Sequence, residues 1–299
     1  MPIDYSSLTE PYDRVAGNAL AYRLRTTVPT GRKFVGMGVA VDVIGAIGIG
    51  LGFLVLFPIG VGALIQGLVT GDADQKGLGI VMVIAGAACA AFTYWLIHRY
   101  FRRTGSAELW WRLDRFARAN GLLFQPWSPE PAFPSALFSA GVGAATYSHV
   151  RHEGPDFYNI GNLYYQTGKV GNETFDHRWG FVAIHLTQTW PAMLLDAKGN
   201  NRLGMNGLPF DLAGTQLLTL TGPGADRYDL WGTPSELPRA TKVFTPALVE
   251  ALTSGIGTYD AHLVDDWLFI YSRREFDMAD PALLAELFGF IDIVRAAKA

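Results

Sequence analysis

Two long apolar runs near the N-terminus dominate the hydrophobic pattern of this chain. Residues 34–69 are nearly all apolar, with a single charge at Asp42, and residues 77–97 carry no charge at all. A helix needs about 20 apolar residues to cross the hydrocarbon of a bilayer. The pattern therefore predicts two transmembrane spans, at about residues 42–68 and 77–98.

Small residues in both runs indicate close packing between helices. Gly48 and Gly52 lie four positions apart in the first run, and Gly86 and Ala90 have the same spacing in the second. Such spacing lets two helix backbones approach each other closely in lipid. We expect these four residues to form a packing surface, mainly between the two spans. Packing against another membrane subunit or a second copy of the chain is the alternative.

Basic residues lie on the outer flanks of the two runs, and the connection between them is acidic. The connection holds Asp72 and Asp74 with only Lys76. Short loops rich in Lys and Arg stay in the cytoplasm. We therefore expect a multi-pass plasma-membrane protein with both termini cytoplasmic and its basic flanks beside membrane lipids. The flanking residues are Arg23, Arg25, Arg32, Lys33, Arg99, Arg102 and Arg103.

Asp42 is the only acidic residue within either run. A carboxylate inside a membrane is costly and is often functional. Because Asp42 lies near the cytoplasmic end of the first run, we interpret it as a carboxylate at the level of the lipid headgroups or as one bonded to a neighbouring residue. A role in moving a proton or cation is the alternative.

An amphipathic helix is predicted directly after the second run. Ser106 can cap its N-terminus and Gly121 can end it, while Leu109, Leu113 and Phe116 share one face. This face either docks on a globular domain or lies on the membrane surface, and we favour docking. The proline-rich residues 125–135 that follow exclude regular helix and central strand, and they predict an extended linker or a covering segment.

Strand patterns begin at about residue 137. Residues 157–166 and 179–189 are rich in aromatic and β-branched side chains, and the turn-like residues 169–176 between them predict an antiparallel pair. Further short strands are expected at residues 193–196, 216–221 and 228–232.

The C-terminal part adds two helices and a further strand region. Thr245 followed by Pro246 predicts a capped helix ending at Gly255, and residues 281–297 form an amphipathic pattern. Between them, two short strands flank Asp265 and Asp266 and predict a hairpin. Strands therefore dominate and the helices come late, which favours an α+β fold.

The expected domain organisation has four parts. Residues 1–33 are a cytoplasmic N-terminal segment, and residues 34–98 are a two-helix transmembrane hairpin. Residues 99–121 are a juxtamembrane amphipathic helix. Residues 122–299 form an α+β, largely antiparallel cytoplasmic domain.

Several short motifs in this last part resemble those of a family of uncharacterised bacterial membrane proteins, best known from actinobacteria. They are Leu220-Thr-Gly, Tyr228-Asp-Leu, Phe244-Thr-Pro-Ala-Leu and the segment from Asp265 to Tyr271. The resemblance implies two spans followed by a cytoplasmic domain, and it implies no catalytic chemistry. This chain departs from the family at Thr221, where an acidic residue is expected.

The charge balance changes along the chain. Residues 1–105 carry a net charge of +3, and residues 106–299 carry −6. An acidic domain is a poor binder of nucleic acid, so we expect no nucleic-acid partner. The basic charge lies where anionic lipid headgroups are expected.

The sequence contains no phosphate-binding loop, dinucleotide fingerprint or nucleophile elbow. Its single cysteine, Cys89, excludes a disulfide framework and a cysteine metal site. His149 and His152 have the spacing of a ligand pair, and Glu153 and His177 are the conceivable additions. We nevertheless expect no metal and no cofactor.

Three functions remain open. We favour a non-catalytic accessory or scaffolding subunit that binds a partner protein through its cytoplasmic domain or its spans. The second is a membrane-tethered enzyme, for which His149, His152, Asp265 and Asp266 are the candidate residues. The third is a component of a transport complex.

Overall fold

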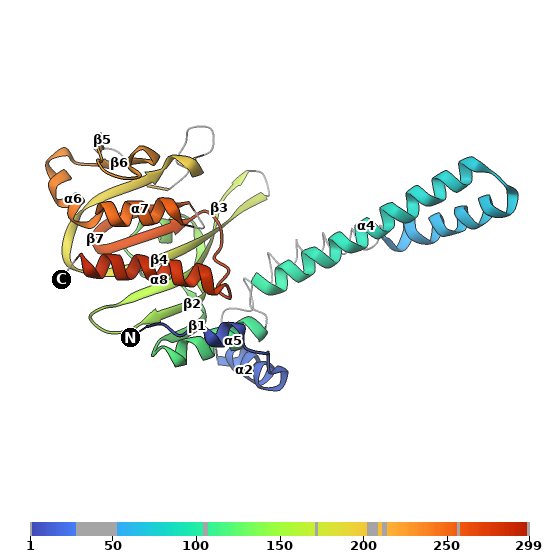
Figure 1. Cartoon of the computed structure of the whole chain (residues 1–299), viewed down its shortest axis with the longest axis horizontal. Coiled ribbons are helices and arrows are strands. Elements are labelled where there is room, and N and C mark those ends of the chain that lie inside the picture. Colours follow the sequence, from blue (N-terminus) through green and yellow to red (C-terminus); the bar gives the residue numbers. More distant parts are fainter. Residues whose placement is uncertain are drawn as a thin grey trace. The chain divides into compact units, whose positions relative to one another are not determined.

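The chain divides into two compact units (Figure 1). Residues Met1–Val28 and Ala107–Ala299 form the globular unit, and residues Pro29–Ser106 form the hairpin unit. The computed structural model describes residues 2–27, 53–103, 107–170, 173–201, 209–210, 214–255 and 258–297.

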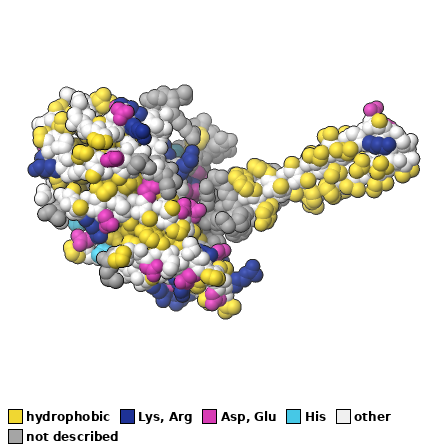
Figure 2. Space-filling model, in the orientation of Figure 1, with side chains coloured by type: hydrophobic (Ala, Val, Ile, Leu, Met, Phe, Trp, Pro, Cys, Tyr) yellow, Lys and Arg dark blue, Asp and Glu magenta, His cyan; other side chains and the backbone are white. Residues whose placement is uncertain are grey.

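The hairpin unit contains two apolar helices, Phe53–Thr70 and α4 (Ala73–Arg103). Each has a segment long and apolar enough to cross a membrane, and few of the side chains in these segments are buried. Figure 2 shows hydrophobic side chains along the outside of both helices. The turn between them is tight because Gly71 adopts a positive φ of 79°. Two apolar N-terminal helices are thus confirmed, while residues 42–52 of the expected first span, with Asp42, lie outside the described residues.

Glycines lie where the two helices of the hairpin unit come closest. A Cβ atom on Gly60 would lie 2.8 Å from the Cβ of Met82, and one on Gly79 would lie 2.6 Å from the backbone nitrogen of Leu64. At Gly86 it would lie 3.1 Å from the Cβ of Phe57. A larger side chain at any of the three positions would push the helices apart.

The structure describes only two of the four residues of the expected packing surface. Gly86 lies against the other helix of the hairpin unit, and Ala90 is partly exposed. Gly48 and Gly52 lie outside the described residues, so the surface of four small residues stays a prediction.

The globular unit is built around a seven-stranded sheet in its described part (Figure 1). The strand order is β1-β2-β3-β4-β6-β5, and β7 pairs with the edge of β4 opposite to β3. Every pair is antiparallel, as the sequence predicted. The strands are β1 (Leu123–Pro129), β2 (Val142–His152), β3 (Tyr158–Val170), β4 (Glu173–Ala197), β5 (Gln216–Leu218), β6 (Tyr228–Gly232) and β7 (Tyr259–Ser272).

Helices cover one face of this sheet (Figure 1). Their buried side chains form one core with those of the strands, including Phe116, Phe244, Leu248 and Phe290. The helices are α5 (Ala107–Ala119), α6 (Leu237–Val243), α7 (Pro246–Ser254) and α8 (Pro281–Ala296). Short 3₁₀ turns occur at Ala136–Ser139, Lys198–Asn200, Ala225–Arg227 and Pro234–Glu236.

The helix ends expected at Gly121, Thr245 and Gly255 are confirmed, while Ser106, the expected cap of α5, lies outside the described residues. The Thr245 side chain accepts a hydrogen bond from the Leu248 backbone nitrogen at 3.2 Å, and the Asp280 side chain caps α8 in the same way. Gly121 ends α5 with a positive φ of 65°. Local cap chemistry therefore determined these boundaries.

The opposite face of the sheet carries an aromatic cluster, which we name by its central residues Phe138, Phe181 and Phe269. All three are almost completely buried. The segment before β2 supplies Phe133 and Phe138, whose rings lie 5.8 Å and 5.5 Å from that of Phe269. The proline-rich segment thus covers this face, as expected.

The hairpin predicted around Asp265 and Asp266 is wrong, because β7 is one continuous strand. Asp265 has a positive φ of 52°, and the pairing of β7 with β4 shifts register there. Ala261 and Leu263 face the helix-side core before this point, and Leu268 and Ile270 face it afterwards. The residues that face the helix-side core are thus odd-numbered before Asp265 and even-numbered after it. This change shows that Asp265 forms a β-bulge, which bends the strand without reversing its direction.

The proline-rich segment also begins with a strand, which the sequence interpretation missed. β1 lies at the edge of the sheet and pairs only with β2. Pro126 lies between the paired residues Gln125 and Trp127 and has no partner in the register. An edge strand tolerates proline because one row of its backbone groups is free of the ladder.

The domain boundaries differ from those expected. Residues 99–103 continue helix α4, and α5 begins separately at Ala107. Leu109, Leu113 and Phe116 of α5 are buried in the core of the globular unit. The amphipathic face thus docks on the domain, which is the alternative that we favoured.

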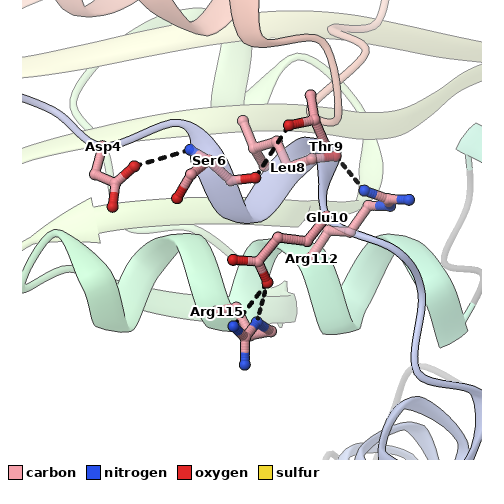
Figure 3. A network of polar contacts seen from close by, with 7 residues as sticks. All are labelled: Asp4, Ser6, Leu8, Thr9, Glu10, Arg112 and Arg115. Carbon is pink, nitrogen blue, oxygen red and sulfur yellow. Dashed lines mark hydrogen bonds and ion pairs between the residues drawn. The ribbon is translucent and has the colours of Figure 1, made fainter.

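The N-terminal segment belongs to the globular unit and packs on α5. Its helices are α1 (Ser6–Thr9) and α2 (Arg14–Thr27). The Glu10 carboxylate accepts a bond from the Arg115 guanidinium at 2.7 Å, and Arg112 donates to the Leu8 carbonyl (Figure 3). The side chain of Tyr5 stacks on Phe116 at 5.8 Å.

Candidate functional site

Several buried polar side chains lie on the face of the sheet that carries the aromatic cluster, opposite the face covered by helices. Leu194 belongs to the aromatic cluster, and Asp196 lies two residues further along β4. On β7, Asp260 and His262 alternate with Ala261, which faces the helix side. Because side chains alternate along a strand, Asp196, Asp260 and His262 face the same side as the aromatic cluster.

Asp260 is completely buried near the start of β7. Its carboxylate accepts hydrogen bonds from the Ala197 backbone nitrogen at 2.9 Å and from the Asn200 side chain at 3.0 Å. The neighbouring Asp196 carboxylate interacts with it electrostatically. The strand ends of β4 and β7 therefore hold two carboxyl groups together with little access to water.

Asn201 and Arg273 complete this group. The Asn201 amide donates to Asp196 at 2.8 Å, and Arg273 donates to the Asn201 carbonyl oxygen at 3.1 Å. The Nε of Arg273 lies 3.8 Å from the Asp260 carboxylate. We call Asp196, Asp260, Asn200, Asn201 and Arg273 the carboxyl cluster.

Burial determines the protonation of the carboxyl cluster. Loss of water raises the pKa of Asp260 to about 7, although the bonds from Ala197 and Asn200 oppose the shift. Burial also raises the pKa of Asp196. The Asp260 carboxyl group therefore keeps its proton up to nearly neutral pH.

A second polar group lies on the same face. The Tyr271 hydroxyl donates to the Ser135 hydroxyl at 2.6 Å, and Ser135 lies 3.1 Å from Nδ1 of His262. Burial lowers the pKa of His262 to about 4, so the imidazole is neutral and its Nδ1 accepts from Ser135. The ring of Phe210 lies 4.2 Å from that of His262.

The Ser135–His262 pair has the residue types of a nucleophile and its base. However, only 1% of Ser135 is exposed. In this structure, the pair is part of a buried chain of hydrogen bonds that links the covering segment to β7. A substrate would reach it only if residues that cover this face moved.

The histidine pair suggested by the sequence lies in two different environments. His149 is buried, lies 3.0 Å from the Asn159 side-chain oxygen and has its pKa lowered to about 4 by burial. His152 stacks its ring on Tyr158 at 5.4 Å. In the part of the chain that the structure describes, no group of three His, Cys, Asp or Glu side chains could hold a metal ion.

Asp265 and Asp266 also have separate roles. Asp265 forms the bulge of β7, and Asp266 lies 2.8 Å from Nε2 of His185. The His185 ring packs against Trp267 at 5.0 Å. Both members of the His185–Asp266 pair are partly exposed, so this contact supports the bend in the sheet at the surface.

Sequence reasoning missed the carboxyl cluster and the Ser135–His262 pair. One signal was available, since Asp260 and His262 flank Ala261 in an otherwise apolar strand. Ser135 gave no signal, because it lies in a proline-rich segment far from β7 in sequence.

Over the residues that the structure describes, these features define a class: a seven-stranded antiparallel α+β unit whose chain is interrupted by two apolar helices. No protein-family model matches the chain, and no curated protein matches it. It is similar to the crystal structure of the mycobacterial trehalose monomycolate transport factor A, TtfA. The identity is 12%, the TM-score is 0.40, and the match covers 62% of this chain and 94% of that one. A likeness at this level carries no argument about function, and the family suggested by the motifs stays a prediction.

Proposed function

We propose that this protein is a membrane-anchored accessory subunit whose globular unit binds a partner protein within a membrane complex. The observation that carries the proposal is the position of the two apolar helices in the chain. They lie between Thr27 and Ala107, and both of these residues belong to the globular unit. The unit is therefore tethered to the helices at two points.

The contacts between the two tethers support this reading. Asn120 and Asp4 exchange hydrogen bonds at 2.7 Å and 2.8 Å, and Glu10 is paired with Arg115. Residues before and after the hairpin unit thus hold each other in place. A doubly tethered domain has fewer orientations at a membrane than one on a single flexible linker, which suits a subunit that presents a fixed surface.

A surface for the partner is available on the β3–β4 ribbon, which we define as residues 167–170 and 173–175. β2 pairs with β3 only as far as Gln166, and β7 pairs with β4 only from Gly180 onward. Among the described residues, the ribbon consequently has no neighbouring strand on either edge, and Figure 1 shows it projecting beyond the sheet. Phe175 on this ribbon is half exposed. Exposed aromatic side chains are frequent anchors of protein interfaces.

A membrane-tethered enzyme is the second candidate, and one observation favours it. Asp260 has a pKa of about 7, and such a carboxyl group can exchange protons at physiological pH. The carboxyl cluster and the Ser135–His262 pair would carry this activity. A role in transport, as the name of the mycobacterial factor states for that protein, is one form of the first proposal.

Co-purification of the full chain from its membrane in mild detergent tests the proposal. We expect a second membrane protein in stoichiometric amount, with recovery reduced at least about tenfold by Phe175→Ser, which corresponds to an interface contact of about 1.4 kcal/mol. Leu217→Ser is the matched control, since Leu217 is also an exposed strand residue. Equal recovery with both variants, or no stoichiometric protein, would contradict the proposal. The identity of the protein shows whether the complex is a transporter.

A further inference from the structure

Helix α2 exposes an apolar face that no described part of the globular unit covers. Val15 and Tyr22 are 81% and 74% exposed. Ala19 lies between them, and residues 15, 19 and 22 fall within about 60° of one another around a helix. We call Val15, Ala19 and Tyr22 the α2 face.

The other side of α2 packs against the rest of the globular unit. Leu20 and Ala21 are buried, and Tyr12, just before the helix, packs its ring 5.7 Å from Trp111 of α5. Arg25 places its guanidinium 5.5 Å from the Trp110 ring. The orientation of α2 is therefore fixed, and the α2 face points away from the domain as a consequence of packing.

Arginines border the α2 face and no acidic residue lies within the helix. Arg14 and Arg25 lie on one side of the face and Arg23 lies on the other, and all three are exposed. Arginines beside an apolar strip can bury their aliphatic stems while their guanidinium groups reach lipid phosphates. Each such residue near an anionic bilayer adds to the attraction between the helix and the membrane.

Few residues along the chain separate the proposed membrane anchor from α5, the helix on which α2 packs. Only residues 104–106 separate the end of α4 from the start of α5, and α2 packs on α5. The apolar side of α5 is occupied by the core of the globular unit, and Trp111 is covered as well. Of these two neighbouring helices, α2 is the one with a large apolar face available.

We propose that the α2 face rests on the anionic headgroup layer of the membrane that the hairpin unit crosses. Val15 and Tyr22 enter the boundary between headgroups and acyl chains, and Arg14 and Arg23 bind lipid phosphates. The inference rests on the proposed membrane anchoring. It adds a third attachment of the globular unit besides its two chain connections.

Spin-label accessibility in the full chain, reconstituted in lipid nanodiscs, tests this contact. Single labels are placed at Tyr22→Cys and Leu217→Cys in a Cys89→Ser chain, and a third label is placed on native Cys89 of α4. Collision rates with oxygen, which concentrates in lipid, are compared with those of a water-soluble nickel chelate. Discs of neutral lipid and discs with one anionic lipid in every three provide the contrast.

We expect the ratio of oxygen to nickel collisions at position 22 to rise several-fold in the anionic discs, and the ratio at position 217 to stay at its aqueous value. Val15→Glu should abolish the rise, whereas Val142→Glu, at a 69% exposed strand position, should preserve it. An aqueous ratio at position 22 in anionic discs would overturn the inference. So would an equal rise in neutral discs, or protection in detergent that shows another protein covering the face.

The label on Cys89 separates this inference from the proposed function. A lipid-like ratio at Cys89 together with an aqueous ratio at position 22 would overturn the lipid contact of α2 alone. An aqueous ratio at Cys89 would overturn the membrane anchoring itself, and with it both proposals.

Discussion

Replacing Phe116 with alanine is expected to lower the free energy of unfolding of the globular unit by about 3 to 5 kcal/mol. The Phe116 side chain is completely buried, and its ring lies 5.8 Å from that of Tyr5 and 6.0 Å from that of Phe288. The residue thus joins the N-terminal segment, α5 and the C-terminal helix α8. Truncation leaves a cavity among three segments that are distant in sequence.

Chemical denaturation of the full chain in detergent, followed by near-ultraviolet circular dichroism, measures this loss. Phe175→Ala is the control, because a half-exposed side chain on the β3–β4 ribbon should cost less than about 0.5 kcal/mol. Amide hydrogen exchange should also speed up in residues 5–27 of the Phe116 variant. A variant as stable as the parent would show that the N-terminal segment and α8 do not share a core through α5.

The second large effect is expected in the pH dependence of stability. The folded chain holds the Asp260 proton up to about pH 7, while an unfolded aspartate releases it near pH 3.9. The stabilisation linked to this proton is complete below about pH 4 and is lost as the pH rises through 7. The shift corresponds to about 4 kcal/mol, as an order of magnitude.

Asp260→Asn should remove this dependence and make the protein more stable than the parent at pH 8. The asparagine side chain carries no charge into the buried site, and the Asn200 amide can turn so that its oxygen, which has no partner among the described residues, becomes an acceptor. The exposed Asp226→Asn is the control and should leave the slope unchanged. If Asp260→Asn keeps the parental slope between pH 4 and 7, Asp260 is not protonated in the folded state.

Two buried histidines impose the opposite trend at lower pH. Burial lowers the pKa of His149 and of His262 to about 4, so both stay neutral while an unfolded histidine gains a proton near pH 6.5. The stability associated with them is present above pH 6.5 and is lost as the pH falls to 4. Subtracting the profile of the Asp260→Asn variant from that of the parent isolates the carboxyl cluster from this background.

Local signals in the sequence predicted much of the fold. The apolar runs, the helix capped at Thr245, the amphipathic last helix and the aromatic pair β3–β4 all follow from patterns within a few residues. The bulge at Asp265 was misread as a turn, because two adjacent aspartates between apolar runs have the composition of a hairpin. Only the pairing of this segment with β4 determines whether the chain bends or reverses its direction at Asp265.

Long-range packing accounts for the rest. The sequence of residues 2–27 is that of a polar segment and does not indicate that it packs on α5. That packing depends on contacts such as Glu10 with Arg115, two residues that the hairpin unit separates along the chain. The carboxyl cluster likewise forms only when the ends of β4 and β7 meet. No spacing in the sequence joins Asp196, Asp260 and Arg273, and none joins Ser135 to His262.

The central claim is a membrane-anchored protein whose globular unit lies in the cytoplasm, and cysteine labelling in intact cells tests it most directly. Single cysteines at Ala73, in the exposed first turn of α4, and at Thr241, on the exposed side of α6, are introduced into the Cys89→Ser chain. A membrane-impermeant maleimide should label position 73 in intact cells and position 241 only after lysis. Labelling of position 241 in intact cells would contradict the account, whether or not position 73 is labelled.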